Sequence, residues 1–226
     1  MPTAEQIRHI IARRAALELK DGEVVNLGIG IPSLVNRYVP SGKHIHLHSE
    51  NGILEFGPPP SQEEADPDLI NASRQPVTEL PGTSYFDSAL SFAMIRGGHI
   101  DVAVVGALQV SEMGDIASWA VPGRAVLGVG GVMDLVVGTK RVIVVMRHTT
   151  KEGEPKLVPK CTLPLTAKGV VDTVITEHAV FHFRDGRMVL VEIGDHIDVA
   201  ELQRITAARF EIEDPLRVVN RWGDLR

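Results

Sequence analysis

The sequence predicts an α/β protein with an open, mixed, mostly parallel sheet flanked by helices. Amphipathic helical segments alternate with short apolar strands, which is typical of this class. The runs 100–105 and 141–146 are apolar except at Asp101 and Arg141, as in parallel strands covered on both faces. Asp185-Gly186 separates two strand-like runs and indicates a hairpin, which suggests an antiparallel edge. No linker is evident, so we expect one domain over 1–226.

Composition excludes several classes of protein. The net charge is −6 and no basic run appears, which argues against nucleic-acid binding. No stretch reaches the ~18–20 apolar residues of a membrane span, and no signal peptide is apparent. The single cysteine, Cys161, cannot form an internal disulfide. We therefore expect a cytoplasmic protein that binds neither nucleic acid nor membrane.

The first elements follow from periodicity and capping. Apolar residues at three- and four-residue steps predict a helix from Thr3 to Lys20, with a capping box at its start and Gly22 as its stop. A buried strand follows over 24–27. Pro32 then suits the first turn of a short helix to about Tyr38.

The middle of the chain contains a long irregular segment. Residues 57–82 are rich in proline and acidic residues, so we expect a functional loop, a partner surface or a solvated excursion there. A helix is predicted over 84–96, ended by Gly97-Gly98. The apolar strand 100–105 follows, and then a polar loop over 109–123.

The second half repeats the alternation. A short helix is expected from Met133 to Val137, then the strand 141–146 and a basic loop over 148–160. Pro164 argues against a central strand in the next segment. After the hairpin, Asp198 and Glu201 have capping-box spacing and open a last helix to about Ala208. The tail 209–226 mixes charges, so we expect it to be loosely held.

The most informative stretch is 44–54, in which an alternating run ends at Ser-Glu-Asn-Gly. Alternation predicts a strand, and Asn51-Gly52 suits a turn because both residues tolerate positive φ. Glu50 is thus expected at the exit of a strand, where α/β sheets build their sites. The non-functional alternative is that Glu50 is simply a solvated carboxylate on a turn.

Other site types have weaker support. Gly28-x-Gly30 follows a strand, but Ser33 replaces the third glycine of a dinucleotide fingerprint, and no phosphate loop or Gly-x-Ser-x-Gly is present. His44, His46 and His48 would share one strand face. No carboxylate or cysteine cluster completes a metal site there, so we expect no metal and a polar face instead. Cys161 is more typical of a small buried residue than of a nucleophile.

A second glycine cluster could complete an anionic site. Gly130-Gly131 follows a strand and precedes the expected start of a short helix. Backbone N–H groups exposed there could hold a developing oxyanion, although a tight turn has the same pattern. By itself this pattern does not separate the two interpretations.

Taken together, these motifs resemble the B (β) subunit of the family I 3-oxoacid CoA-transferases. The resemblance runs from about Ala15 to Phe210. It rests on Ser-Glu-Asn-Gly in order with five other segments: 25–32, 68–72, 91–99, 128–135 and 160–166. It implies an open sheet of the NagB/RpiA/CoA-transferase-like fold. It also implies that the partner is an A (α) subunit, in a heterotetramer of two A and two B chains.

The resemblance assigns roles to individual residues. Glu50 matches the catalytic glutamate, and the backbone amide of Gly131 matches an expected oxyanion donor. Residues expected to contact the substrate or CoA are Asn26, Gly28, Gly30, Asn51, Gly52, Arg74, Ser118 and Gly130. The chain departs from its relatives at three positions: Arg74 stands for lysine, Ser118 for asparagine and Glu55 for a common glycine.

The implied activity is transfer of CoA between carboxylic acids, with succinyl-CoA as donor and a 3-oxoacid such as acetoacetate or 3-oxoadipate as acceptor. CoA is then a substrate and a covalent intermediate on Glu50, and no permanent cofactor is needed. An acyl-CoA hydrolase and a non-catalytic acyl-CoA-binding module are the alternatives.

Overall fold

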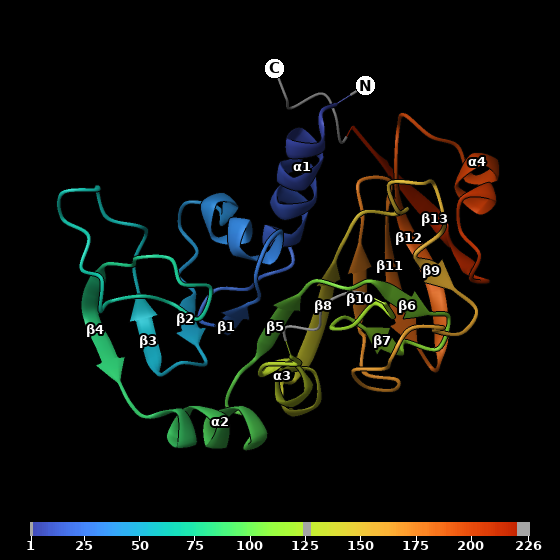
Figure 1. Cartoon of the computed structure of the whole chain (residues 1–226). Helices are drawn as coiled ribbons and strands as arrows, with labels where there is room; N and C mark the ends of the chain where they lie inside the picture. The colour runs from blue at the N-terminus through green and yellow to red at the C-terminus, as the bar shows by residue number, and fades with distance from the viewer. Residues whose placement is uncertain (1, 124–127, 221–226) are drawn as a thin grey trace.

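A computed structural model describes residues 2–123 and 128–220 of the chain. Most of its strands join one large sheet: β1 (Val24–Leu27), β2 (His46–Ser49), β3 (Ile53–Phe56), β4 (Glu79–Tyr85), β5 (Val102–Val105), β8 (Arg141–Val145), β10 (Thr173–Ile175), β11 (Ala179–Arg184), β12 (Arg187–Gly194) and β13 (Glu211–Val219). Their spatial order is β13-β12-β11-β10-β8-β5-β1-β2-β3-β4. The hydrogen-bonded order thus places the earliest strands next to the two central apolar ones (Figure 1).

A smaller sheet and the helices complete the described fold. β6 (Gln109–Ser111), β7 (Ile116–Ala117) and β9 (Leu157–Val158) form the three-stranded sheet β7-β6-β9. The helices are α1 (Ala4–Ala16), the 3₁₀ helix η1 (Pro32–Tyr38), α2 (Ser88–Arg96), α3 (Val132–Gly138) and α4 (Val199–Arg204). Figure 1 shows α2 and α3 close together, and α4 on the side of the picture where β13 forms the edge of the sheet. None of the described helices is long and apolar enough to cross a membrane.

The large sheet is mixed and mostly parallel, which confirms the predicted fold class. Among the described strands, β2, β1, β5, β8 and β10 are parallel neighbours, as are β12 and β13. The pairs β2–β3, β3–β4, β10–β11 and β11–β12 are antiparallel. The predicted hairpin is β11–β12, and Asp185 (φ 52°) and Gly186 (φ 71°) form its turn. It lies one strand inside the edge, because β13 pairs outside it.

The central strands β5 and β8 are apolar, apart from Arg141 at the start of β8, because helices cover both of their faces. In β8, Val142 and Val144 pack in one core with Ile95 of α2 and Leu135 of α3. The alternate residues Ile143 and Val145 pack in the other core with α1. A strand buried on both sides cannot show polar alternation.

Three helix ends differ from the sequence prediction. Thr3 does form a reciprocal capping box with Gln6, but α1 ends at Ala16, where the chain tightens into i→i−3 hydrogen bonds such as Glu18 N–H to the Ala15 carbonyl. α2 begins at Ser88, since Asp87 accepts from the Leu90 amide as N-cap. α4 begins after Asp198 as expected and ends at Arg204, short of Ala208.

Several strands were missed from the sequence. Residues 109–123 are not a loop throughout, because β6 and β7 pair there. β10 was not predicted. The tail was expected to be loosely held, yet Glu211–Val219 forms edge strand β13, whose Arg217 pairs with Glu192 of β12. The strand expected just before Gly128, and the tail beyond 220, lie outside the described residues.

Candidate functional site

Glu50 lies on the turn that joins β2 to β3, at the carboxyl end of β2. The Gly52 amide donates to the Ser49 carbonyl at 2.9 Å, which closes a four-residue turn with Glu50 and Asn51 at its centre. Gly52 has φ 114°, and a Cβ there would lie 1.9 Å from the Phe86 carbonyl oxygen. Only glycine fits this position, so the turn geometry accounts for the Asn-Gly of the motif.

Asn26 holds the carboxylate of Glu50. The residue is fully buried in β1, and its Cα pairs with that of His48 across the parallel β1–β2 ladder. Its Nδ2 atom donates to Glu50 Oε2 at 3.1 Å and also lies 3.1 Å from His48 Nδ1. Its Oδ1 atom is buried without a hydrogen-bond partner among the described residues. The predicted Asn26 and Glu50 are therefore in contact.

His48 helps to position Asn26 through a hydrogen bond between their side chains. If Asn26 donates to His48 Nδ1, the proton of the neutral ring is on Nε2, which then donates to Ser91 Oγ at 3.0 Å. Burial lowers the pKa of His48 to about 4, which keeps the ring neutral. The result is a chain of hydrogen bonds from Glu50 through Asn26 and His48 to α2.

Gly131 lies beside Glu50, as expected from the sequence. It is the N-cap of α3, with φ −89°, so its backbone needs no special conformation. A Cβ at this position would lie 3.5 Å from Glu50 Cγ and 2.8 Å from Phe92 Cζ. An added Cβ would therefore clash with the Phe92 ring, whereas its distance from Glu50 Cγ is an ordinary van der Waals contact. Gly130 has φ +57° and shapes the same loop.

The other glycines shape the exit of β1. The Gly28 amide donates to the Val104 carbonyl at 2.8 Å, and a Cβ there would lie 3.2 Å from that oxygen. Gly30 has φ +94°, which favours glycine. These residues therefore allow the β1 exit to lie close against β5.

Three predicted residues form no hydrogen bond with the Glu50 side chain among the described residues. Asn51 instead donates to the Ile70 carbonyl at 2.8 Å and thereby helps to hold the 57–78 segment against the turn. Arg74 is exposed at φ +60°. Ser118 Oγ lies 2.7 Å from Thr166 Oγ1. In the part of the chain that the structure describes, no hydrogen bond or ion pair joins any of the three to the Glu50 side chain.

Sequence reasoning missed His48, Ser91 and Phe92 as members of the site. His48 was interpreted only as part of a polar strand face, and the residues of α2 were interpreted as a helix and as part of the resemblance, without a role at the site. The signal that could have found His48 is the parallel register of β1 and β2, which places it opposite Asn26. A single sequence does not reveal that register.

A cavity of about 770 Å³ opens near the carboxyl ends of β1, β5 and β8. Its lining includes Ile29, Pro32, Gly106, Arg147, Lys151 and Lys156. Burial lowers the pKa of Lys156 to about 8, and its Nζ atom donates to the Ala107 carbonyl at 2.7 Å. The cavity adjoins the same edge of the sheet as the exit of β1, and it carries cationic groups.

Cys161 does not have the properties of a nucleophile. Burial and then the charge of Asp115 raise the pKa of its thiol to about 11. The thiolate is therefore scarce at neutral pH. This agrees with the interpretation of Cys161 as a small apolar residue and not a nucleophile, although the residue is only partly buried.

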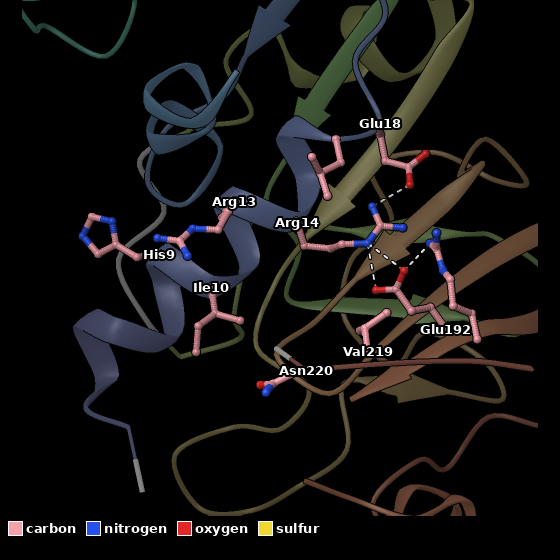
Figure 2. A pocket seen from close by; sticks show the side chains of 10 residues that line it. His9, Ile10, Arg13, Arg14, Glu18, Glu192, Val219 and Asn220 are labelled. Carbon is pink, nitrogen blue, oxygen red and sulfur yellow. Dashed lines mark hydrogen bonds and ion pairs between the residues drawn. The ribbon is translucent and has the colours of Figure 1, made fainter. Parts of the chain in front are cut away.

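A second pocket, of about 340 Å³, lies between α1 and the ends of β12 and β13 (Figure 2). Arg14 of α1 forms two ion pairs: its Nε atom lies 2.8 Å from Glu192 Oε1, and its Nη1 atom lies 2.7 Å from Glu18 Oε1. Arg217 also pairs with Glu192. Burial lowers the pKa of Arg14, but the hydrogen bond and charge of Glu192 outweigh it and keep the pKa above its ordinary value. No predicted site residue lines this pocket. We interpret the charged residues that line this pocket as an ion-pair cluster that holds α1 against β12 and β13.

The chain is similar to known CoA-transferase subunits over most of its length. It is 53% identical over 215 residues to the beta subunit of the acetate CoA-transferase of Escherichia coli K12, covering 95% of this chain and 97% of the relative. It is 51% identical over 208 residues to the B subunit of a probable succinyl-CoA:3-ketoacid coenzyme A transferase of Bacillus subtilis, covering 92% and 96%. A human mitochondrial succinyl-CoA:3-ketoacid coenzyme A transferase 2 is 50% identical over 215 residues, and the match covers 94% of this chain but 42% of that longer one.

Solved structures share the fold at low sequence identity. The acyl-CoA transferase YdiF of Escherichia coli O157:H7 matches with TM-score 0.77 and 21% identity over 98% of this chain and 44% of that one. A thioester complex of YdiF with CoA matches with TM-score 0.72 and 20% identity, over 95% and 43%. A family model described as "Coenzyme A transferase" matches residues 8–203 of this chain. With this match and relatives above 50% identity, the chain belongs to the coenzyme A transferase family, as its motifs indicated.

Proposed function

We propose that this chain is the B subunit of an enzyme that transfers CoA from succinyl-CoA to a 3-oxoacid such as acetoacetate or 3-oxoadipate. The observation that carries the catalytic part is the carboxylate of Glu50, placed on a tight turn and held by Asn26 at 3.1 Å. The names of the relatives support the substrate class, and they differ in the acid: acetate for one and a 3-ketoacid for others. A transfer assay is therefore needed to identify the donor and acceptor acids.

The reaction begins with Glu50 as a nucleophile. A carboxylate oxygen of Glu50 attacks the thioester carbonyl carbon of the acyl-CoA, and CoA leaves as its thiolate, so that an acyl-glutamyl anhydride forms. The thiolate then attacks the carbonyl carbon of Glu50 and displaces the free carboxylate product, which leaves a glutamyl-CoA thioester. The acceptor acid reverses both steps. A covalent route of this kind gives ping-pong kinetics.

Each attack produces an oxyanion that needs hydrogen-bond donors. We assign one donor to the backbone amide of Gly131, which the resemblance indicates and which its position beside Glu50 Cγ supports. One such donor typically contributes about 10²–10³ in rate. The unpaired Oδ1 atom of Asn26 offers an acceptor to a donor group on the bound substrate. Arg74 and Ser118 would join the site only through the substrate, since neither forms a hydrogen bond or ion pair with Glu50 in the described structure.

The thioester energy is retained throughout, so the exchange needs no permanent cofactor, and CoA serves as substrate and covalent intermediate. We further propose that an A subunit completes the site, in an assembly of two A and two B chains. The names of the bacterial relatives, which identify them as subunits, support such a partner.

The test is a transfer assay on the chain co-expressed with its A subunit, over a panel of acids that includes acetate, acetoacetate and 3-oxoadipate. Borohydride added after incubation with acyl-CoA should reduce the thioester to an alcohol at Glu50, which peptide mass mapping locates. Glu50→Ala should lose both transfer and labelling, whereas Glu63→Ala, on an exposed carboxylate of the 57–78 segment, should keep both.

Three outcomes would contradict parts of the proposal. Full transfer by Glu50→Ala would exclude the nucleophile. Consumption of acyl-CoA without any acceptor acid would indicate a hydrolase, and binding of acyl-CoA without turnover would indicate a binding module. Full activity of this chain without an A subunit would exclude the two-subunit site.

A further inference from the structure

The hairpin that carries Glu50 has a second cluster of reactive side chains at its other end. His46 is the first residue of β2, His44 lies two residues before it, and Glu55 lies in β3, which pairs with β2 in the antiparallel direction. Among the residues that the structure describes, this is the only group of three or more histidine, cysteine, aspartate or glutamate side chains whose ligand atoms converge within 4.8 Å.

The contacts within this cluster are specific. Glu55 Oε1 lies 2.9 Å from His44 Nε2, and Glu55 Oε2 lies 2.5 Å from His46 Nδ1. The two imidazole rings meet edge to face, with centroids 4.7 Å apart. One carboxylate therefore contacts both imidazoles, one through each of its oxygens.

The position of Glu55 is what brings the carboxylate inward. Its φ is 61°, in the left-handed region, at an irregularity of the β3–β4 ladder between Leu54 and Phe56. The residue is only 8% exposed, while the side chains of His44 and His46 are 61% and 41% exposed. The cluster is thus anchored on its buried side by the carboxylate and is open to solvent on the side of the imidazoles.

We propose that His44, His46 and Glu55 bind a divalent transition-metal ion, for which Zn²⁺ is the best match. Zinc takes imidazole nitrogen at about 2.0–2.1 Å and carboxylate oxygen at about 2.0–2.2 Å, in sites with three protein ligands and one open position. The exposed side of the cluster leaves that position to water. Mg²⁺ and Ca²⁺ are poorer matches because they prefer sites made of oxygen ligands.

The cluster needs only a small adjustment to accept the ion. Ligands of one tetrahedral ion at these bond lengths lie roughly 3.3 Å apart. The ligand atoms here lie within 4.8 Å of one another, so no pair has to move by more than about 1.5 Å, and His46 and Glu55 must separate by somewhat less than 1 Å. The proton shared in each imidazole–carboxylate contact leaves when the metal binds, because metal ligands must be deprotonated. The imidazole rings are exposed enough to turn without disturbing the core.

The proposed ion would have a structural role, since it would tie β2 to β3 at the end opposite the turn. His46 precedes Glu50 by four residues, which is roughly 13 Å along an extended strand. The ion therefore takes no part in the transfer chemistry, and the proposal does not rest on that function. The sequence alone favoured no metal here, because it gave no reason to bring Glu55 back to the histidines.

The test uses the full chain, stripped with a chelator and titrated with Zn²⁺ by calorimetry, with the visible spectrum of added Co²⁺ as an independent report of the ligand set. We expect one strong site per chain. Glu55→Gly suits this purpose because glycine accepts φ 61° without strain, and His44→Ala changes an exposed side chain. Each should weaken binding by at least about tenfold, which is the usual minimum even for changes outside the ligand shell.

His99→Ala is the matched control, since it removes an exposed histidine outside the cluster. It should bind Zn²⁺ as the native chain does. Added Zn²⁺ should also raise the melting temperature of the native chain and of His99→Ala, but not that of Glu55→Gly. The proposal is overturned if the native chain binds no Zn²⁺, or if Glu55→Gly and His44→Ala bind it with native affinity.

Discussion

Asn26 and Glu50 are 24 residues apart in the sequence, yet the side-chain amide of Asn26 donates to the carboxylate of Glu50 at 3.1 Å. The parallel pairing of β1 with β2 produces this contact, because it sets Asn26 opposite His48 and brings the turn after β2 over the end of β1. The nucleophile proposed here is thus positioned by a neighbouring strand as well as by its own turn.

The first prediction concerns this hydrogen bond. Asn26→Ala should lower kcat for CoA transfer by about 10- to 150-fold, since a hydrogen bond to a charged group contributes roughly 1.5–3 kcal/mol. Ser91→Ala removes only the far end of the hydrogen-bond chain and leaves the Asn26–Glu50 bond in place, so its effect should be smaller. Steady-state kinetics of the co-expressed enzyme measure both. Equal kcat in Asn26→Ala and the native enzyme would mean that the bond does not matter for the reaction.

The second prediction concerns the close approach at Gly131. An added Cβ there meets Phe92 Cζ at 2.8 Å and Glu50 Cγ at 3.5 Å, so Gly131→Ala must displace either the ring or the loop. We expect transfer to fall while the fold is kept, because the backbone at this position is not strained. Phe92→Ala in the same chain removes the clash, and the double variant should recover part of the lost rate. If the double variant is no better than Gly131→Ala, the clash with Phe92 is not the cause.

The third prediction separates crowding from backbone strain in the turn after Glu50. Gly52→Ala combines φ 114° with a Cβ 1.9 Å from the Phe86 carbonyl, whereas Gly42→Ala has φ 98° and open space. Gly42→Ala should cost about 1–2 kcal/mol in the free energy of unfolding, from strain alone. Gly52→Ala should cost clearly more, as measured by urea unfolding. Equal costs would show that the hairpin moves away from Phe86 without penalty.

The sequence predicts those parts of the fold that local residues determine. β5 and β8 were found because both of their faces are buried and, apart from Arg141 at the start of β8, their residues are apolar. The β11–β12 hairpin was found because Asp185 and Gly186 are residues that adopt positive φ readily. The start of α1 was found because Thr3 and Gln6 cap each other within one turn.

The parts that were missed depend on contacts between distant segments. β13 has no buried apolar face, so its sequence lacks the alternating pattern that predicts a strand. Ion pairs such as Arg187–Glu211 help to hold it at the edge of the sheet. Its assignment requires knowledge that β12 lies beside it. The same holds for the site: Glu50 was identified from its motif, but His48 and Ser91 join it only through the register of β1 and β2 and the packing of α2.

The fourth prediction concerns the pH dependence of stability at His148, which is fully buried. Its ring nitrogens lie 3.0 Å from Thr176 Oγ1 and 2.8 Å from Thr206 Oγ1. Burial, and then the charges of His178 and Lys156, lower its pKa from 6.5 to about 3. Between these values the unfolded chain binds a proton that the native chain does not. Falling pH therefore favours unfolding, by at most about 1.4 kcal/mol per pH unit for this group.

His148→Gln removes this dependence and keeps a polar side chain near the two threonines. The native chain should be more stable than the variant at neutral pH, and this difference in the free energy of unfolding should shrink as the pH falls from about 6.5 toward 4.5. Above about pH 7.5 the difference should be constant, because the ring is neutral in both states there. Urea unfolding at a series of pH values measures it. A difference that stays constant or grows toward low pH would mean that His148 is protonated in the native chain, contrary to the burial that surrounds it.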